Sequence, residues 1–122
     1  YYMKVLKFGG AIVGSAEHLK KVKSIVEAEK NSIVVVSAMD GVTDLLEEIV
    51  EEASTGDSKS IISRYEDLKT RHTELARQVV PADRQSAALS ELNRLYSEMD
   101  SMLQALTIFR DWTDNILATF LS

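Results

Sequence analysis

The pattern of apolar and polar positions divides the chain into a mixed first half and a helical second half. Two short apolar runs, Val5–Phe8 and Ile33–Val36, have the length and composition of strands. Between them, apolar residues recur at helical spacing from about Ala16 to Lys30, and Ser15 can cap that helix. A strand, a helix and a strand in this order predict a βαβ unit with parallel strands and a right-handed crossover.

The next segments complete the first half of the chain. Ile33–Val36 is an uninterrupted β-branched run, which is typical of a strand covered on both faces. A further helix is expected to begin near Thr43 or Asp44, because Asp44 and Glu47 form a pair resembling a capping box. The small polar residues and glycine of Ser54–Asp57 should end this helix.

The second half has a helical pattern throughout. Apolar residues recur at steps of three and four over Ile61–Val79, and Pro81 ends that helix. His72 lies on its apolar face, where a hydrogen-bonded core histidine is expected. A second long helix covers Leu89–Leu106 and includes methionines expected to fill the core. Trp112–Leu121 is either its continuation or a separate helix. Two long helices joined by a short link predict an antiparallel hairpin.

Composition fits one globular domain and argues against several classes of partner. The 122 residues are 45% hydrophobic and contain no cysteine, which excludes disulfides and thiolate metal sites. The net charge is −5 and the basic residues are scattered among acids, so nucleic acid is not expected as a partner. No apolar run approaches the ~20 residues that span a membrane, and no signal peptide is visible, which predicts a cytoplasmic protein. We expect a single domain over 1–122, with a βαβα half at 3–57 and a helical half at 58–122.

Candidate chemistry gathers where the two strands end in glycine-bearing loops. Val5–Phe8 runs into Gly9 and Gly10, with Lys7 beside them, and the second strand ends in Ser37–Asp44. Glycine lets the backbone come close to an anion, and a helix N-terminus offers free N–H groups. This layout predicts a phosphate site and therefore points to phosphoryl transfer.

Each of these residues also has an ordinary structural explanation. Lys7 can be a solvated lysine at a strand end, and the paired glycines can simply make a tight turn. Hydroxyls at a strand end or helix start, as at Ser37 and Thr43, are more often caps than ligands. Asp40 and Asp44 could hold magnesium, but a turn residue and a helix cap are their more usual roles. The two histidines have no ligand spacing, so we expect no metal site.

Three motifs together resemble the N-terminal part of aspartate kinase, including the aspartokinase half of fused aspartokinase–homoserine dehydrogenases. They are K-F-G-G at Lys7–Gly10, V-G-S-A-E at Val13–Glu17 and V-V-S-A-M-D-G-V-T-D at Val35–Asp44. That family has the amino-acid kinase fold, a three-layer α/β/α sandwich. The resemblance implies an α/β fold class, with a partial amino-acid kinase fold built from a small parallel sheet and a helical hairpin.

The resemblance also implies a reaction and a role for individual residues. The family transfers the γ-phosphoryl group of ATP, bound with magnesium, to the side-chain carboxylate of aspartate. Lys7 would be catalytic by neutralising the transferring group, while Gly9, Gly10 and Ser37 would bind phosphate and Thr43 would contact aspartate. Such chemistry consists mainly of positioning and charge stabilisation.

Several positions depart from the family pattern. Ala11 and Ile12 replace the Thr-Ser that follows K-F-G-G, and Asp40 stands where the family has a small residue. The glutamate that would hold the aspartate amino group has no counterpart in Asp114–Leu121. We therefore expect an N-terminal fragment of an aspartokinase catalytic domain that is inactive in this form. The alternative is an engineered or structural scaffold without a ligand, and a homo-oligomer could form through a sheet edge or another uncovered surface.

Overall fold

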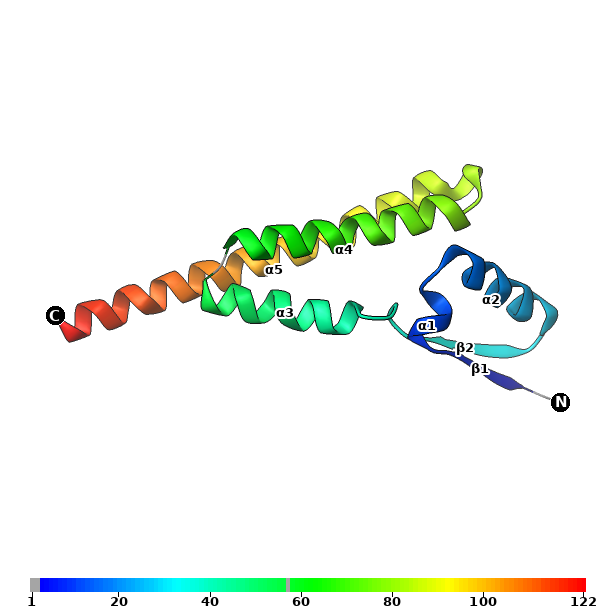
Figure 1. Cartoon of the computed structure of the whole chain (residues 1–122), viewed down its shortest axis with the longest axis horizontal. Helices are drawn as coiled ribbons and strands as arrows, with labels where there is room; N and C mark the ends of the chain where they lie inside the picture. Colours follow the sequence, from blue (N-terminus) through cyan, green and yellow to red (C-terminus); the bar gives the residue numbers. More distant parts are fainter. Residues whose placement is uncertain (1–2, 57) are drawn as a thin grey trace.

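The computed structural model describes residues 3–56 and 58–122, and it joins a mixed α/β half to a helical half (Figure 1). The elements in chain order are β1 (Lys4–Phe8), α1 (Gly10–Val13), α2 (Ala16–Ala28), β2 (Ser32–Val36), α3 (Val42–Thr55), α4 (Ser58–Val79) and α5 (Ala82–Leu121). α4 and α5 lie side by side, α3 packs against both of them, and α2 packs against α4. The described part is therefore mostly helical, with a small sheet at one end.

β1 and β2 form a two-stranded parallel sheet, which confirms the predicted βαβ unit. The register pairs Lys4 with Ser32 and continues without a bulge to the end of both strands. α2 forms the crossover between them. Its N-cap is Ser15, as predicted, because the Ser15 side chain accepts a hydrogen bond from the His18 N–H at 3.2 Å.

The expectation that β2 is covered on both faces is wrong. Its four β-branched residues, Ile33–Val36, are between 40% and 58% exposed. The sheet of the described residues has two strands, so each strand has one free edge and part of the sheet surface is open. A β-branched run shows that a strand suits burial, but the coverage itself depends on which elements pack there.

α3 begins slightly earlier than the Asp44 capping pattern predicts. Gly41 is its N-cap, with a φ of +79°, and no side chain caps the helix there. Glycine adopts this left-handed conformation easily, so the helix starts directly after it and Asp44 lies in the first turn. At the other end Gly56, with a φ of +110°, terminates the helix as expected. Asp57, also expected at this end, lies outside the described residues.

α4 and α5 form the predicted antiparallel hairpin, with Pro81 at the turn between them (Figure 1). α5 is one continuous helix, so Trp112–Leu121 is a continuation of it and not a separate element. No helix in the described part of the chain combines the length and apolar character needed to cross a membrane.

Aromatic residues join the two helices of the hairpin. The rings of Tyr65 and Tyr96 meet edge to face at 6.2 Å, and the Tyr65 hydroxyl donates to the Tyr96 carbonyl at 2.7 Å. Burial, together with the neighbouring Tyr65, raises the pKa of Tyr96 to about 12. His72 is half-buried, and its Nδ1 lies 2.8 Å from the Leu68 carbonyl oxygen, which confirms a hydrogen-bonded histidine.

The last part of α5 carries exposed apolar side chains. Figure 1 shows this end of the helix projecting beyond α3 and α4. Trp112 is 59% exposed and its ring lies 6.1 Å from that of Phe109, while Phe120 is 82% exposed. Met102 is 70% exposed, so the expectation that it fills the core is wrong, whereas Met99 does pack against the core.

The core draws on both halves of the chain. Its buried members are Phe8, Val13, Val22, Met39, Val42, Ile49 and Leu68. Ile49 of α3 is fully buried at the centre of this cluster. Ion pairs reinforce the packing of α3 on α4, because Arg64 of α4 contacts both Glu48 and Glu52 of α3. The position of α3 therefore rests on apolar burial supplemented by charged contacts.

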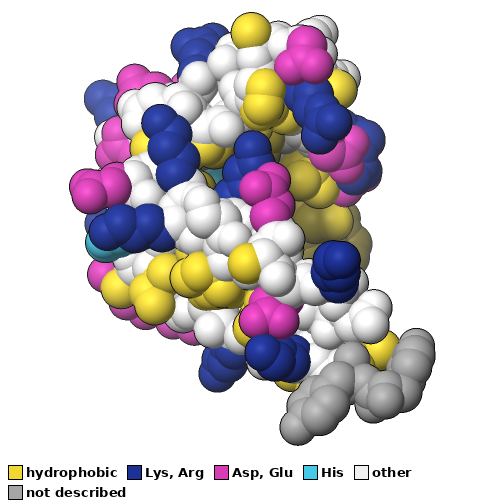
Figure 2. Space-filling model, turned by 90° about the vertical axis from the view of Figure 1, so that its right-hand side faces the viewer, with side chains coloured by type: hydrophobic (Ala, Val, Ile, Leu, Met, Phe, Trp, Pro, Cys, Tyr) yellow, Lys and Arg dark blue, Asp and Glu magenta, His cyan; other side chains and the backbone are white. Residues whose placement is uncertain are grey.

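Charges of both signs are mixed on the end of the molecule formed by α2 and the α4–α5 turn. Figure 2 shows this end, where Lys and Arg side chains alternate with Asp and Glu and form no continuous basic stripe. A phosphate backbone is normally bound by such a stripe or groove. This face therefore lacks the usual electrostatic feature of a nucleic-acid site.

We expect Ile49→Ala to lower the free energy of unfolding by about 2–5 kcal/mol, because the shortened side chain leaves a cavity in the core. Val50→Ala is the matched control, since Val50 is the next residue on α3 but is 54% exposed. It should change the free energy by about 0.5 kcal/mol or less. Urea unfolding followed by circular dichroism measures both, and equal losses would contradict the assignment of Ile49 to the core.

Candidate functional site

The loops that follow β1 and β2 lie against each other. Parallel strands end at the same edge of a sheet, so the pairing of β1 with β2 brings both loops together. Two backbone hydrogen bonds join them. The Ser37 N–H donates to the Phe8 carbonyl at 3.0 Å, and the Asp40 N–H donates to the Gly10 carbonyl at 3.1 Å. The two loops thus form one connected unit at the start of α3.

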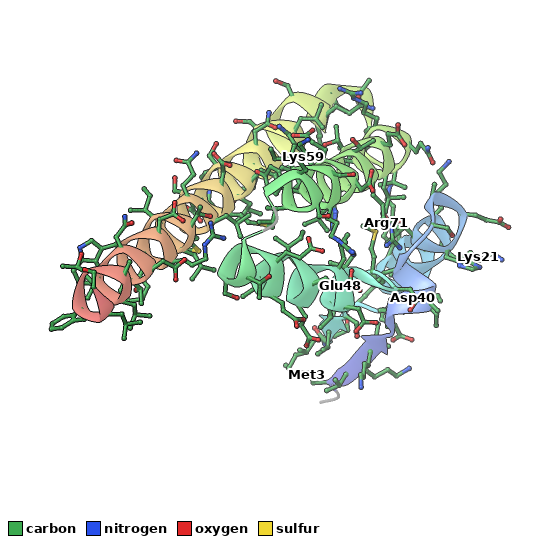
Figure 3. All side chains as sticks on the ribbon, turned by 60° about the vertical axis from the view of Figure 1, so that its left-hand side comes forward. Met3, Lys21, Asp40, Glu48, Lys59 and Arg71 are labelled. Atoms are coloured by element: carbon green, nitrogen blue, oxygen red, sulfur yellow. The ribbon has the colours of Figure 1, made fainter. Side chains whose placement is uncertain are left out.

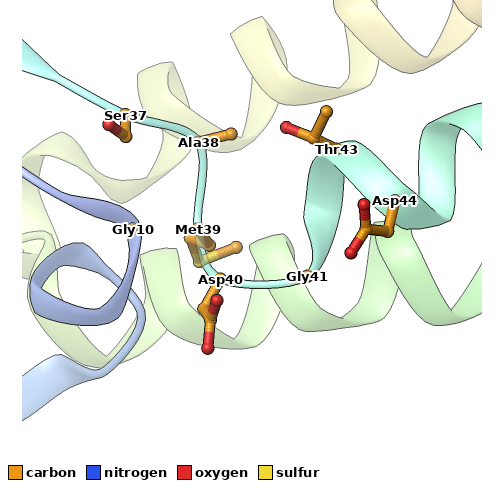
Figure 4. A pocket seen from close by; sticks show the side chains of 8 residues that line it. All are labelled: Gly10, Ser37, Ala38, Met39, Asp40, Gly41, Thr43 and Asp44. Atoms are coloured by element: carbon orange, nitrogen blue, oxygen red, sulfur yellow. The ribbon is translucent and has the colours of Figure 1, made fainter.

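A hollow of about 260 Å³ lies between these loops and the first turn of α3 (Figure 4). It is lined by Gly10, Ser37, Ala38, Met39, Asp40, Gly41, Thr43 and Asp44. The structure therefore brings three of the predicted site residues, Gly10, Ser37 and Thr43, to one place. Lys7 and Gly9 are not among its lining residues.

Lys7 is accessible from solvent but lies outside the hollow. Successive strand residues point to opposite faces, and the neighbouring Phe8 points into the core. Lys7 is paired in register with Val35, which is 45% exposed, on the open face of the sheet. The structure therefore places Lys7 on the open face of the sheet, next to the end of β1 and not in the hollow.

The paired glycines have different structural requirements. At Gly10, an added Cβ would lie 2.7 Å from the Ala38 carbonyl oxygen and 3.3 Å from the Asp40 nitrogen. The fold therefore needs glycine at this position whatever the loop binds. Gly9 has a φ of −76° and no atom within 4 Å of an added Cβ. The fold does not require glycine there, and the open space beside its backbone suits the close approach of a ligand.

The charged side chains at the hollow are acidic. Asp40 and Asp44 line it, and no Lys or Arg is among its lining residues. Carboxylates so placed repel phosphate groups and carboxylates alike. Among residues 3–56 and 58–122, no group of three or more His, Cys, Asp or Glu is arranged to hold a metal ion. A phosphate ligand at this hollow therefore needs a counterion of its own or a cation from a neighbouring element.

Arg71 of α4 supplies a positive charge beside the loops, and the sequence patterns did not identify it as a site residue. Its Nη1 donates to the Asp40 carbonyl at 2.7 Å, and Figure 3 shows the two residues facing each other. One sequence signal could have found it. Arg71 stands three residues after Leu68 and four before Leu75, so helical spacing puts a cation on the face that packs against the body.

Comparison with known proteins places the chain in a family. The sequence model of the amino acid kinase family matches residues 3–120, so the chain belongs to the amino acid kinase family. The bifunctional aspartokinase/homoserine dehydrogenase 2 of Arabidopsis thaliana, described as chloroplastic, is 32% identical over 106 residues, which cover 85% of this chain and 12% of that protein. The two-stranded parallel sheet and its helices are compatible with part of an α/β amino-acid kinase domain.

Single-function aspartokinases are also similar to this chain. The aspartokinase of Chlamydia muridarum is 39% identical over 75 residues, covering 62% of this chain and 16% of that protein. The aspartokinase of Chlamydia trachomatis is 54% identical over 44 residues, covering 36% of this chain and 10% of that protein. The resemblance to the N-terminal part of aspartokinases is therefore confirmed. The chain spans between 10% and 16% of the length of these relatives.

We expect Gly10→Ala to lower the free energy of unfolding by about 1–3 kcal/mol, because the new methyl group would force backbone atoms of the facing loop to move. Gly9→Ala is the matched control, with open space around its Cβ position. It should cost less than about 1 kcal/mol, the usual loss when alanine replaces glycine at a helix N-cap. Thermal unfolding of the two variants measures the difference in stability. An equal loss of stability in Gly9→Ala and Gly10→Ala would show that the fold does not require glycine at position 10 more than at position 9.

Proposed function

We propose that this chain is the N-terminal segment of an aspartokinase-type phosphotransferase. In this proposal Mg-ATP is the phosphoryl donor, L-aspartate is the acceptor, and 4-phospho-L-aspartate is the product, formed in the cytoplasm. The observation that supports it most is the contact between the two glycine-bearing loops, which leaves a polar hollow at the ends of parallel strands. The aspartokinase names of the similar proteins supply the reaction.

The proposed roles are those that the resemblance to aspartate kinase implies. An oxygen of the aspartate side chain attacks the γ-phosphorus of ATP, and the bond from that phosphorus to the bridging oxygen of ADP breaks. Gly9, Gly10 and Ser37 would hold phosphate oxygens, since the backbone at Gly9 is open and the other two residues line the hollow. Thr43, also at the hollow, would contact aspartate, and Lys7 would neutralise charge on the transferring group.

We also propose that the chain does not catalyse the reaction alone. Asp40 and Asp44 place negative charge where anionic ligands would bind. The exposed residues Ala11 and Ile12 of α1 offer no hydroxyl beside the first loop. The matched region is a minor share of each relative, so the groups that complete a kinase site would come from regions like those outside the matched part.

Ligand binding is expected to raise the thermal unfolding midpoint of the chain. Mg-ATP and Mg-ADP should each stabilise the native state, by about 2.7 kcal/mol at a hundredfold excess over the dissociation constant. Lys7→Ala should reduce this gain, because an accessible cation beside the phosphate groups is lost. Lys21→Ala, on the exposed side of α2, is the control and should leave it unchanged. Absence of any shift at millimolar nucleotide, with or without aspartate, would refute ligand binding by the isolated chain.

Catalysis needs a separate measurement, because a chain that binds nucleotide need not transfer phosphate. The chain is mixed with a complementary C-terminal fragment of an aspartokinase, and ADP release is followed. The expected result is release that requires ATP, aspartate and both polypeptides. No gain over either polypeptide alone would contradict a contribution to a shared catalytic site.

A second candidate function, a self-assembling scaffold without a ligand, is favoured by the exposed apolar surface. The β2 residues Ile33–Val36 remain open to solvent, and so do Trp112 and Phe120 at the projecting end of α5. Strands with free edges and large apolar side chains in solution are common sites of self-association. Both surfaces are therefore proposed routes to a homo-oligomer.

Static light scattering over a micromolar to millimolar concentration series tests this candidate. We expect the mean mass to rise above that of a single chain as concentration increases. Val35→Lys should suppress the rise if the sheet is the contact, and Trp112→Lys should suppress it if α5 is the contact, because a buried lysine is costly. A mass that stays at one chain up to the highest concentration would end the scaffold interpretation.

A further inference from the structure

The guanidinium of Arg71 lies between the C-cap of α1, Gly14, and the loop that follows β2. Its Nη1 donates to the Asp40 carbonyl at 2.7 Å, and the same atom lies 4.0 Å from the place of a Cβ on Gly41. On its other side, Nη2 lies 3.8 Å from the place of a Cβ on Gly14. One side chain of α4 thus reaches both the end of α1 and the residue that starts α3.

Arg71 uses its charge differently from the other arginines that link elements. Arg64 and Arg110 each contact a carboxylate as well as an element other than their own. Within the part of the chain that the structure describes, no carboxylate lies within ion-pair distance of Arg71. This half-buried cation is therefore held by a backbone carbonyl, and it lies beside a hollow lined by Asp40 and Asp44.

The hydrogen bond from Arg71 holds the loop that follows β2 from a second side. The Asp40 N–H is held by the Gly10 carbonyl at 3.1 Å, and the Asp40 carbonyl is held by Arg71. The Val42 N–H donates to the Met39 carbonyl at 3.0 Å and closes the turn between them. Residue 40 is thus held from the first loop on one side and from α4 on the other. The turn that sets the start of α3 has little freedom to move.

We propose that Arg71 is the positioning residue of the glycine-loop site. It holds the turn at 39–42 so that Ser37, Thr43 and Gly10 face one hollow, and its charge offsets the two carboxylates there. The inference rests on the proposed function, because it assigns Arg71 to the same phosphate-binding site. Lysine cannot replace it fully, since an ammonium group carries the charge without the planar guanidinium that reaches both the end of α1 and the second loop.

The test compares Arg71→Gln, Arg71→Lys and the control Arg77→Gln, which changes an exposed arginine in the last turn of the same helix. Amide hydrogen exchange at Asp40 and Val42 is measured by NMR without ligand, and the dissociation constant for Mg-ATP is measured separately. Arg71→Gln should speed exchange at these amides and raise the dissociation constant by about tenfold. Arg71→Lys should fall between this variant and the parent chain in both measurements, and Arg77→Gln should match the parent chain.

The outcomes separate a positioning role from general stability and from the proposed function. Exchange that rises equally at all core amides would show that Arg71 only supports the fold, and would overturn the proposal. An Arg71→Lys variant with unchanged exchange and affinity would overturn it as well, because charge alone would then be sufficient. If the parent chain does not bind Mg-ATP, the proposed function fails, but this result does not decide whether Arg71 positions the second loop. The ligand-free exchange data then report separately whether Arg71 holds the turn.

Discussion

The close contact between the loops after β1 and β2 is the constraint on which the rest of the arrangement depends. Parallel pairing brings the two loops to one edge, and the absence of a side chain at Gly10 lets the backbones meet. Three features depend on this contact: the hollow, the start of α3 at Gly41, and the hydrogen bond from Arg71 to the second loop. A larger residue at position 10 would separate the loops before any question of ligand binding arose.

This constraint changes how the glycine motif should be interpreted. Gly10 is required by packing, so its presence is explained without a ligand. Gly9 has no such requirement, which makes it the more informative of the pair about binding. The charges at the hollow argue in the opposite direction, because Asp40 and Asp44 disfavour anions there. The backbone geometry thus suits a phosphate group while the carboxylates oppose it, and Arg71 places a positive charge beside the second loop.

The sequence predicted those features that depend on local pattern. Helical periodicity and Pro81 predicted the hairpin, and two apolar runs around a capped helix predicted the parallel strand pair. The exposure of β2 could not be predicted, because coverage depends on which elements pack on a strand. Arg71 was missed because its contact with Asp40 joins residues 31 positions apart, and no periodicity encodes such a pairing. Of the site residues, Gly10, Ser37 and Thr43 could be grouped because parallel strand ends must meet.

α4, which carries none of the residues first predicted for the site, helps to hold the loops in place. The sheet contributes limited burial, since Ile33–Val36 remain at least 40% exposed. The buried core joins Ile49 of α3 and Leu68 of α4 to residues of β1, α1 and α2. α3 starts at the second loop, and α4 reaches that loop through Arg71. A substitution that weakens the packing of α4 would therefore change the position of the loops at the hollow, even though α4 and α5 contribute no lining residue to it.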